Sequence, residues 1–216
     1  MRILILGSPG SGKGTISSLL MDFFNNESVK YYNVGEILRG RWQDDDHIKE
    51  VHAAGGIVDS DRVMGIFDEA LDHEWFLLDG SPRKENEAQY ILNHPKWKSN
   101  PGYLIYLKID PEAARNRLLL RKRFDDTPDV MDRRFEAFLK ETTKSIQAFD
   151  SAKRLLTVDA SQDAKAVCYD ILKFIINNTN ENRLPKLSRA DIEKIIRFSG
   201  IEDPLPGVNL MTEPNE

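Results

Sequence analysis

Residues 3–15 read ILILGSPGSGKGT, an apolar run that passes directly into a glycine-rich loop. The apolar residues Ile3 to Leu6 predict a buried strand, and the spacing from Lys13 to Phe24 predicts a helix. Between a strand and a helix, such a loop cradles phosphate, because its backbone N–H groups point inward and the helix N-terminus and the lysine add positive charge. We therefore expect the phosphate-binding residues to be Gly10, Ser11, Gly12, Lys13, Gly14 and Thr15.

Further apolar runs alternate with segments of helical spacing along the chain. The expected strands are Trp75 to Leu78, Tyr103 to Ile109, Leu155 to Val158 and a weaker run at Val29 to Tyr32. The expected helices are Asp61 to Leu71, Lys84 to Leu92, Pro111 to Leu120, Pro128 to Phe149 and Asp163 to Ile176. Strands that alternate with helices pair in parallel and carry helices on both faces. The sequence therefore predicts an α/β, doubly wound fold with a central parallel sheet.

The composition excludes several classes of protein. Lys and Arg number 30 against 35 Asp and Glu in 216 residues, a net charge of −5 that disfavours a general binder of nucleic acids or anionic membranes. The single cysteine, Cys168, rules out an internal disulfide framework, which is typical of a protein in a reducing compartment. Because Cys168 lies on an apolar helical stripe, we expect its side chain to be buried in the core. No stretch has the ~20 apolar residues of a membrane helix, and the apolar start is too short for a signal peptide. A soluble, cytoplasmic protein is expected.

The composition changes after Ile176. Residues 177–182 read NNTNEN, a polar break typical of a linker. Beyond it, Ser188 to Asp191 resembles a helix cap, and prolines follow from residue 204. We expect a compact domain over 1–178 and, over 179–216, a polar linker, a short helix and a tail that catalysis does not need.

The phosphate loop departs from the general motif at one position. Many nucleotide hydrolases place Ser or Thr directly after the lysine to hold Mg²⁺, whereas here Gly14 stands between Lys13 and Thr15. No Asn-Lys-x-Asp run is present to read guanine in the donor nucleotide. The loop GSPGSGKGT resembles that of the adenylate kinase and nucleoside-monophosphate kinase (NMP kinase) family. The resemblance implies a P-loop fold with a helical NMP-binding insertion at about 33–62 and a lid at about 121–132.

The same resemblance assigns residues to the acceptor nucleotide. The run NVGEILR at 33–39 looks like the start of the insertion, in which Arg39 would fork onto the acceptor phosphate. The run GGIVDSD at 55–61 is similar to the turn that faces the acceptor base. The implied acceptor residues are Val34, Gly35, Arg39, Gly56, Ile57, Val58, Gly80, Arg83, Glu87, Arg123 and Arg134.

The strand ending at Asp79 predicts a metal-binding position. A carboxylate at the carboxyl end of a buried strand, beside the phosphate loop, can hold Mg²⁺ through water. Thr15 is a second candidate ligand. The four histidines lack metal-binding spacing and are expected at the surface or as caps, and no zinc site is expected.

Glu87 departs from the family pattern, which has Gln at that position and Phe where Ser81 stands. An ionised carboxylate accepts hydrogen bonds but cannot donate, so it suits a base edge with two N–H groups, such as guanine, better than adenine. A solvated residue on a helix is the alternative for Glu87. The resemblance still favours AMP as the acceptor, with other bases open.

Arginines gather on either side of Asp125-Asp126. Taken alone, such a cluster is usually a solvated set of ion pairs. By resemblance, the cluster is the phosphoryl clamp of a short-lid family member. Together with Lys13 and Arg83, the catalytic cations would be Arg121, Arg123 and Arg134, while Arg117 and the backbone near Gln162 would contact the donor adenine.

These observations support an enzyme that transfers the γ-phosphoryl group of ATP to an NMP with Mg²⁺, as a monomer whose partners are small nucleotides. The alternative is a P-loop module that binds nucleotide but has lost transfer and acts through a partner. The departures at Val34, Ser81 and Glu87 motivate this alternative, and the retained arginines argue against it.

Overall fold

The structure is a computed structural model of the chain, and it describes residues 1–24, 29–41, 44–120 and 127–178. In those residues five parallel strands form one sheet in the order β2-β3-β1-β4-β5. The strands are β1 (Arg2–Gly7), β2 (Lys30–Asn33), β3 (Phe76–Asp79), β4 (Tyr103–Lys108) and β5 (Leu155–Asp159). The predicted α/β fold with a parallel sheet is confirmed.

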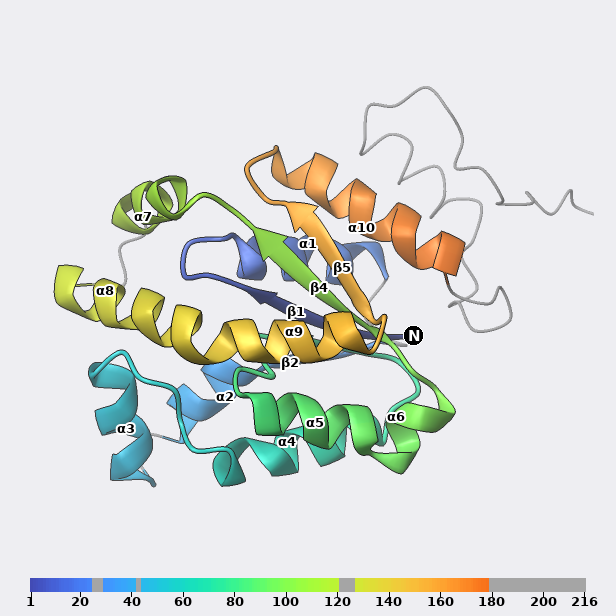
Figure 1. The fold of residues 1–216 in the computed structure, drawn as a ribbon, viewed down its shortest axis with the longest axis horizontal. Helices are drawn as coiled ribbons and strands as arrows, with labels where there is room; N and C mark the ends of the chain where they lie inside the picture. Colours follow the sequence, from blue (N-terminus) through green and yellow to red (C-terminus); the bar gives the residue numbers. More distant parts are fainter. Residues whose placement is uncertain (25–28, 42–43, 121–126, 179–216) are drawn as a thin grey trace, which may run out of the picture.

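Helices cover both faces of the sheet (Figure 1). One face carries α1 (Lys13–Phe23) and α10 (Ala164–Asn178), and the other carries α4 (Asp61–Leu71), α5 (Glu85–Asn93), α6 (Pro95–Ser99) and α9 (Thr143–Ser151). The side chains of β1 alternate between the two cores, since Ile3 and Ile5 pack toward α1 and α10 while Leu4 and Leu6 pack toward the opposite helices. Each of these four side chains is at most 1% exposed, because a parallel strand in the middle of a sheet is buried on both faces.

The remaining helices lie around the carboxyl ends of the strands (Figure 1). They are α2 (Val34–Gly40), α3 (Asp46–Ala53), α7 (Pro111–Leu120) and α8 (Pro128–Ala137). Helices α2 and α3 fall in the segment predicted as a helical insertion. Their first turns are capped by Asn33 and Asp45, whose side chains accept the backbone N–H groups of Glu36 and Ile48.

The helix predicted over Pro128 to Phe149 is present, but its middle is not α-helical. The chain forms α8, a π-helical segment η1 (Phe138–Thr142) and then α9, which follow one another without a break. A π turn accommodates an extra residue per turn, and such turns are frequent at functional sites. The hydroxyl of Thr143, the first residue of α9, donates to the Leu139 carbonyl of η1 at 2.7 Å. A helical pattern read from apolar spacing does not detect one inserted residue.

Cys168 is buried, at 1% exposure, as its place on the apolar stripe of α10 predicted. Burial raises the pKa of its thiol to about 12. A thiol with so high a pKa carries almost no thiolate at neutral pH and is a packing residue.

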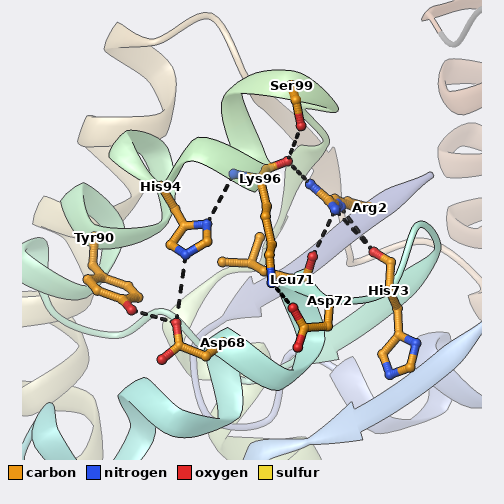
Figure 2. A network of polar contacts seen from close by, with 9 residues as sticks. All are labelled: Arg2, Asp68, Leu71, Asp72, His73, Tyr90, His94, Lys96 and Ser99. Atoms are coloured by element: carbon orange, nitrogen blue, oxygen red, sulfur yellow. Dashed lines mark hydrogen bonds and ion pairs between the residues drawn. The ribbon is translucent and has the colours of Figure 1, made fainter.

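A buried arginine ties the sheet to the helices at the end opposite the phosphate loop (Figure 2). Arg2, at the start of β1, is 6% exposed. Its guanidinium donates to backbone carbonyls near the ends of α4 and α6, at Leu71 (2.9 Å), His73 (3.2 Å), Asn100 (3.1 Å) and Lys96. Helix C-termini leave carbonyls without intrahelical partners and attract positive charge, so Arg2 satisfies two helix ends at once.

Replacing Arg2 with alanine is expected to lower the free energy of unfolding by about 2–4 kcal/mol, because the buried Leu71 carbonyl and the partly buried carbonyls of His73 and Asn100 lose their donor. Arg115→Ala is the matched control, since Arg115 is half-exposed in an ion pair with Asp132 and should change stability by less than about 1 kcal/mol. Urea unfolding of both variants measures the difference. Equal stabilities would show that the Arg2 bonds contribute nothing net.

Candidate active site

The phosphate loop, the insertion and α8 surround one cavity of about 560 Å³ at the carboxyl ends of the strands. Strand β1 lies between β3 and β4, which is where a doubly wound sheet reverses its winding and binds ligands. The cavity brings together most of the predicted site residues: Gly10, Gly12, Lys13, Gly14, Thr15, Gly35, Arg39, Gly56, Ile57, Asp79, Gly80, Arg83, Arg117 and Arg134.

The phosphate loop has the backbone that its glycines predict. Gly10 and Gly12 have φ angles of +82° and +89°, which L-residues rarely adopt. The Lys13 ammonium donates to the carbonyls of Gly7 at 2.8 Å and Ser8 at 3.0 Å, so it lies within the loop. Ser11 is buried and does not line the cavity, although it belongs to the same loop.

Helix α7 packs directly against this loop. A Cβ atom on Gly10 would lie 2.2 Å from the Ala114 carbonyl oxygen, so only glycine permits the contact. Arg117, one turn further along α7, donates from Nη1 to the Ala160 carbonyl at 2.8 Å. Gln162 belongs to the same β5–α10 loop but does not line the cavity, and its side chain donates to the Asp159 carbonyl at 3.2 Å.

Asp79 lies at the end of β3 and is 4% exposed. Its Oδ2 accepts hydrogen bonds from the Ser17 hydroxyl at 3.0 Å and the Tyr31 hydroxyl at 3.1 Å. Burial, followed by the charge of Asp79, raises the pKa of Tyr31, so the phenol stays protonated and keeps donating. These two hydroxyls fix the carboxylate at the wall of the cavity. Sequence reasoning found Asp79 but neither of its partners.

Carboxylate and hydroxyl oxygens that line one cavity suit Mg²⁺, which prefers oxygen ligands and keeps several waters. Thr15 and Asp79 both line the cavity. Among the described residues no group of three or more His, Cys, Asp or Glu side chains could hold a metal by itself. This donor set fits a Mg²⁺ ion that is bound jointly with nucleotide phosphates.

Three arginines from different elements line the cavity on the side of the insertion: Arg39 from α2, Arg83 from the β3–α5 loop and Arg134 from α8. Burial lowers the pKa of Arg83, while the charges of Glu87 and Asp79 raise it and those of Arg134 and Arg39 lower it. Guanidinium groups gathered this closely repel one another. Such a cluster is suited to a polyanion, because anionic oxygens offset the repulsion.

The insertion contacts α8 across the cavity mouth. A Cβ atom on Gly55 would lie 2.8 Å from the Val130 carbonyl oxygen, and Gly55 has a φ angle of +74°. The Arg133 side chain donates from Nε to the Ala54 carbonyl at 2.7 Å. The turn at 54–56 and the start of α8 therefore lie against each other in this structure.

A narrow recess of about 20 Å³ opens beside the main cavity. Its walls include the predicted acceptor residues Val34, Gly35, Gly56, Ile57, Val58, Arg83 and Glu87. The other residues that line it are Leu38, His52, Val63 and Ser81, two apolar and two polar, and a recess of this volume holds about one water molecule. His52, one of the histidines expected at the surface or as caps, is partly buried and lines both cavities.

The interpretation of Glu87 as a solvated helix residue was wrong, because its side chain is buried at 1% exposure. Its Oε2 accepts the backbone N–H groups of Arg83 at 2.7 Å and Lys84 at 3.3 Å, and its Oε1 accepts the Ser60 hydroxyl at 3.1 Å. Burial raises the pKa of Glu87, while these hydrogen bonds and the charge of Arg83 act against that rise.

Glu87→Gln is expected to stabilise the fold at pH 7. A carboxyl group with a raised pKa binds its proton more tightly in the folded state, so stability falls as pH rises from about 4.5 and stays lower above the raised pKa. The amide of Gln does not ionise, so the variant avoids this loss of folding stability, and it retains an oxygen that accepts the backbone N–H groups. Chemical unfolding at pH 4 and pH 7 should show a gain for the variant at pH 7 that shrinks at pH 4. Glu85→Gln, at an exposed position of the same helix, is the control, and a variant less stable than the parent at pH 7 would contradict the prediction.

Two predicted catalytic residues, Arg121 and Arg123, lie outside the described residues. The site also contains residues that the sequence did not indicate, among them Asn33, His52, Phe138 and Thr142. The last two come from η1, whose extra residue could not be read from the helical pattern. His52 could have been suspected from its place three residues before Gly55.

Comparisons with known proteins agree with this geometry. The sequence model of the family described as "Adenylate kinase" matches residues 5–154. The chain is 31% identical to an adenylate kinase of Oenococcus oeni, over 82% of this chain and 98% of the relative, and 32% identical to one of Prochlorococcus marinus, over 79% and 96%. It is also 28% identical to UMP-CMP kinase 1 of Oryza sativa, over 91% and 84%. Within the described residues, no helix is both long and apolar enough to span a bilayer.

Proposed function

The chain belongs to the adenylate kinase family, and from that premise we propose that it transfers the γ-phosphoryl group of ATP to a nucleoside monophosphate. The observation that carries the proposal is that the phosphate loop and three arginines from other elements line the same cavity. A protein that only binds one nucleotide needs the loop but not a second group of cations across from it. The cavity is also large enough for phosphates approaching from both sides.

The donor nucleotide is assigned to the side of the phosphate loop. The backbone N–H groups from Gly10 to Thr15 and the N-terminus of α1 would hold the β- and γ-phosphates of ATP, with Lys13 following the charge as it moves. Arg117 would flank the adenine, because it reaches the β5–α10 loop through Ala160. The Gln162 backbone lies in that loop and stays a candidate for the edge of the base.

The acceptor is assigned to the insertion side. Arg39, Arg83 and Arg134 would bind the acceptor phosphate and the transferring group, which carries its negative charge on oxygens spread around phosphorus. Reaction then requires only that the acceptor oxygen attack the γ-phosphorus in line, so the residues act by positioning and charge rather than by a covalent intermediate. The contact between the turn at 54–56 and α8 would help to exclude water. Arg121 and Arg123 are proposed to complete the clamp from the short lid.

Mg²⁺ is proposed as the metal bound with ATP. Asp79 would hold it through water, and Thr15 is the second candidate. The ion, when present, neutralises charge on the β- and γ-phosphates. The Ser17 and Tyr31 hydroxyls would keep the Asp79 carboxylate in one orientation for that water.

AMP is proposed as the preferred acceptor. Two of the relatives described above are named adenylate kinase, and the turn residues 56–58, which line the recess, offer backbone groups to a base edge. The relative named UMP-CMP kinase 1 makes the pyrimidine monophosphates the next candidates. The alternative of a module that binds nucleotide without transfer is disfavoured by the arginines retained around the cavity.

An acceptor panel tests the proposal. Formation of ADP from ATP is followed in a coupled assay with AMP, CMP, UMP and GMP, at equal concentrations and with Mg²⁺. We expect turnover with AMP above the others and none without an acceptor. The absence of turnover with every acceptor would reject the kinase assignment. A higher rate with another monophosphate would reject the preference for AMP and leave the kinase assignment standing.

A further inference from the structure

Arg83 is held at both of its ends by short hydrogen bonds. Its backbone N–H donates to Glu87 Oε2 at 2.7 Å, and its side-chain Nε donates to the Gly80 carbonyl at 2.7 Å. Gly80 has a φ angle of +86°, and a Cβ atom there would lie 3.4 Å from Arg83 Nη2. Neither bond uses the two terminal nitrogens of the guanidinium fork, which is the part that pairs with phosphate oxygens.

The Glu87 carboxylate accepts hydrogen bonds both from the loop that carries Arg83 and from the insertion. One oxygen accepts two consecutive backbone N–H groups at the start of α5, the arrangement of a helix-capping glutamate. The other oxygen accepts the hydroxyl of Ser60, which immediately precedes α4. At 1% exposure the carboxylate is also shielded from water. Its bonds therefore connect the end of the insertion to the loop between β3 and α5.

We propose that Glu87 is a positioning residue for Arg83 and does not read the acceptor base. The carboxylate fixes the backbone of the β3–α5 loop, and the fixed loop presents the guanidinium to the acceptor phosphate. This inference rests on the proposed transfer to a monophosphate. It replaces the interpretation of Glu87 as a base contact, because three donors from the protein already engage both of its oxygens.

The two roles differ in what a conservative substitution does. Gln keeps one oxygen for the N–H groups of Arg83 and Lys84, and its amide can donate to the Ser60 oxygen, so a positioning role survives Glu87→Gln. A base-reading role does not survive it, because exchanging an acceptor for a donor changes which base edge is matched. Ala removes both oxygens and releases the loop.

The experiment measures kcat and KM for AMP, CMP, UMP and GMP in the parent, Glu87→Gln, Glu87→Ala and the exposed control Glu85→Gln. We expect Glu87→Ala to lower kcat at least tenfold by the same factor for every acceptor that the parent uses, with KM for ATP unchanged. Glu87→Gln should stay within about threefold of the parent in kcat and in the ratios between acceptors. A shift of more than tenfold in those ratios would overturn the proposal in favour of base reading.

A second pair of variants tests whether Glu87 acts through Arg83. In an Arg83→Lys background, the further change Glu87→Ala should lower kcat by less than threefold, because the guanidinium that Glu87 would position is already absent. A full tenfold loss in that background would overturn the proposal. If Glu87→Ala does not give a cooperative thermal transition, Ser60→Ala replaces it, with an expected acceptor-independent loss of about threefold, and an unchanged kcat would count against the proposal. A parent protein inactive with all acceptors would instead reject the proposed function, so the two failures are distinguishable.

Discussion

Arg83→Ala is expected to lower kcat for phosphoryl transfer by about a thousandfold, while the fold stays intact. Arginines that stabilise the charge of a transferring phosphoryl group contribute on the order of 10³-fold or more to the rate. Arg83 lines the cavity between the phosphate loop and the insertion, and its side-chain Nε is fixed by the Gly80 carbonyl. The guanidinium is only partly buried and lies among other cations, so its removal should not destabilise the protein.

Steady-state kinetics with saturating ATP and AMP measure the effect of Arg83→Ala, and thermal unfolding verifies the fold. Arg115→Ala serves as the control, because it removes an arginine from the surface and should leave kcat unchanged. Arg83→Lys should recover only a small part of the rate, since an ammonium cannot form the planar two-pronged contact. A kcat for Arg83→Ala within threefold of the parent would exclude Arg83 from the transition state.

Lys13→Met is expected to lower kcat/KM by roughly a hundredfold to a thousandfold, the loss typical of removing one preorganised electrostatic contact. Methionine has nearly the length of lysine and keeps its packing at the start of α1, so the change isolates the charge. In the structure the ammonium lies within the phosphate loop, on the carbonyls of Gly7 and Ser8. We expect it to leave these carbonyls for phosphate oxygens when ATP binds.

The control for this variant is Lys144→Met on α9, where the lysine is about half-exposed and pairs with Glu141. Isothermal titration with ATP, together with the kinetics, separates loss of binding from loss of rate. Unaltered ATP affinity with a lower kcat would indicate a role confined to the transition state, and loss of both a role in binding as well. Full activity in Lys13→Met would contradict the assignment of the phosphate loop.

The parts of the fold that follow from local chemistry were predictable from the sequence. The alternation of apolar and helical segments was enough for the parallel sheet, and the loop GSPGSGKGT marked the edge at which the site forms. Asp79 was found because a polar residue that ends a buried strand must lie at the same sheet edge as the phosphate loop. The burial of Cys168 followed from its helical stripe.

What was missed depends on contacts between segments far apart in the chain. Tyr31 and Ser17 meet Asp79 from β2 and α1, and no spacing within either segment indicates that meeting. The burial of Glu87 needed Ser60, 27 residues earlier, to reach its carboxylate. The π turn at Phe138–Thr142 inserts one extra residue where the helix lines the cavity. The spacing of apolar residues over the whole helix does not reveal a single inserted residue.

The central claim is that both nucleotides react directly in one cavity, and the fate of a labelled γ-phosphate tests it. The protein is incubated with [γ-³²P]ATP, Mg²⁺ and excess AMP, and the products are separated by chromatography. The account predicts that the label passes to the β-position of ADP with almost none released as inorganic phosphate, because the cavity is expected to exclude water when both nucleotides are bound. Release of most of the label as inorganic phosphate, whether or not AMP is present, would show a hydrolase and contradict the account.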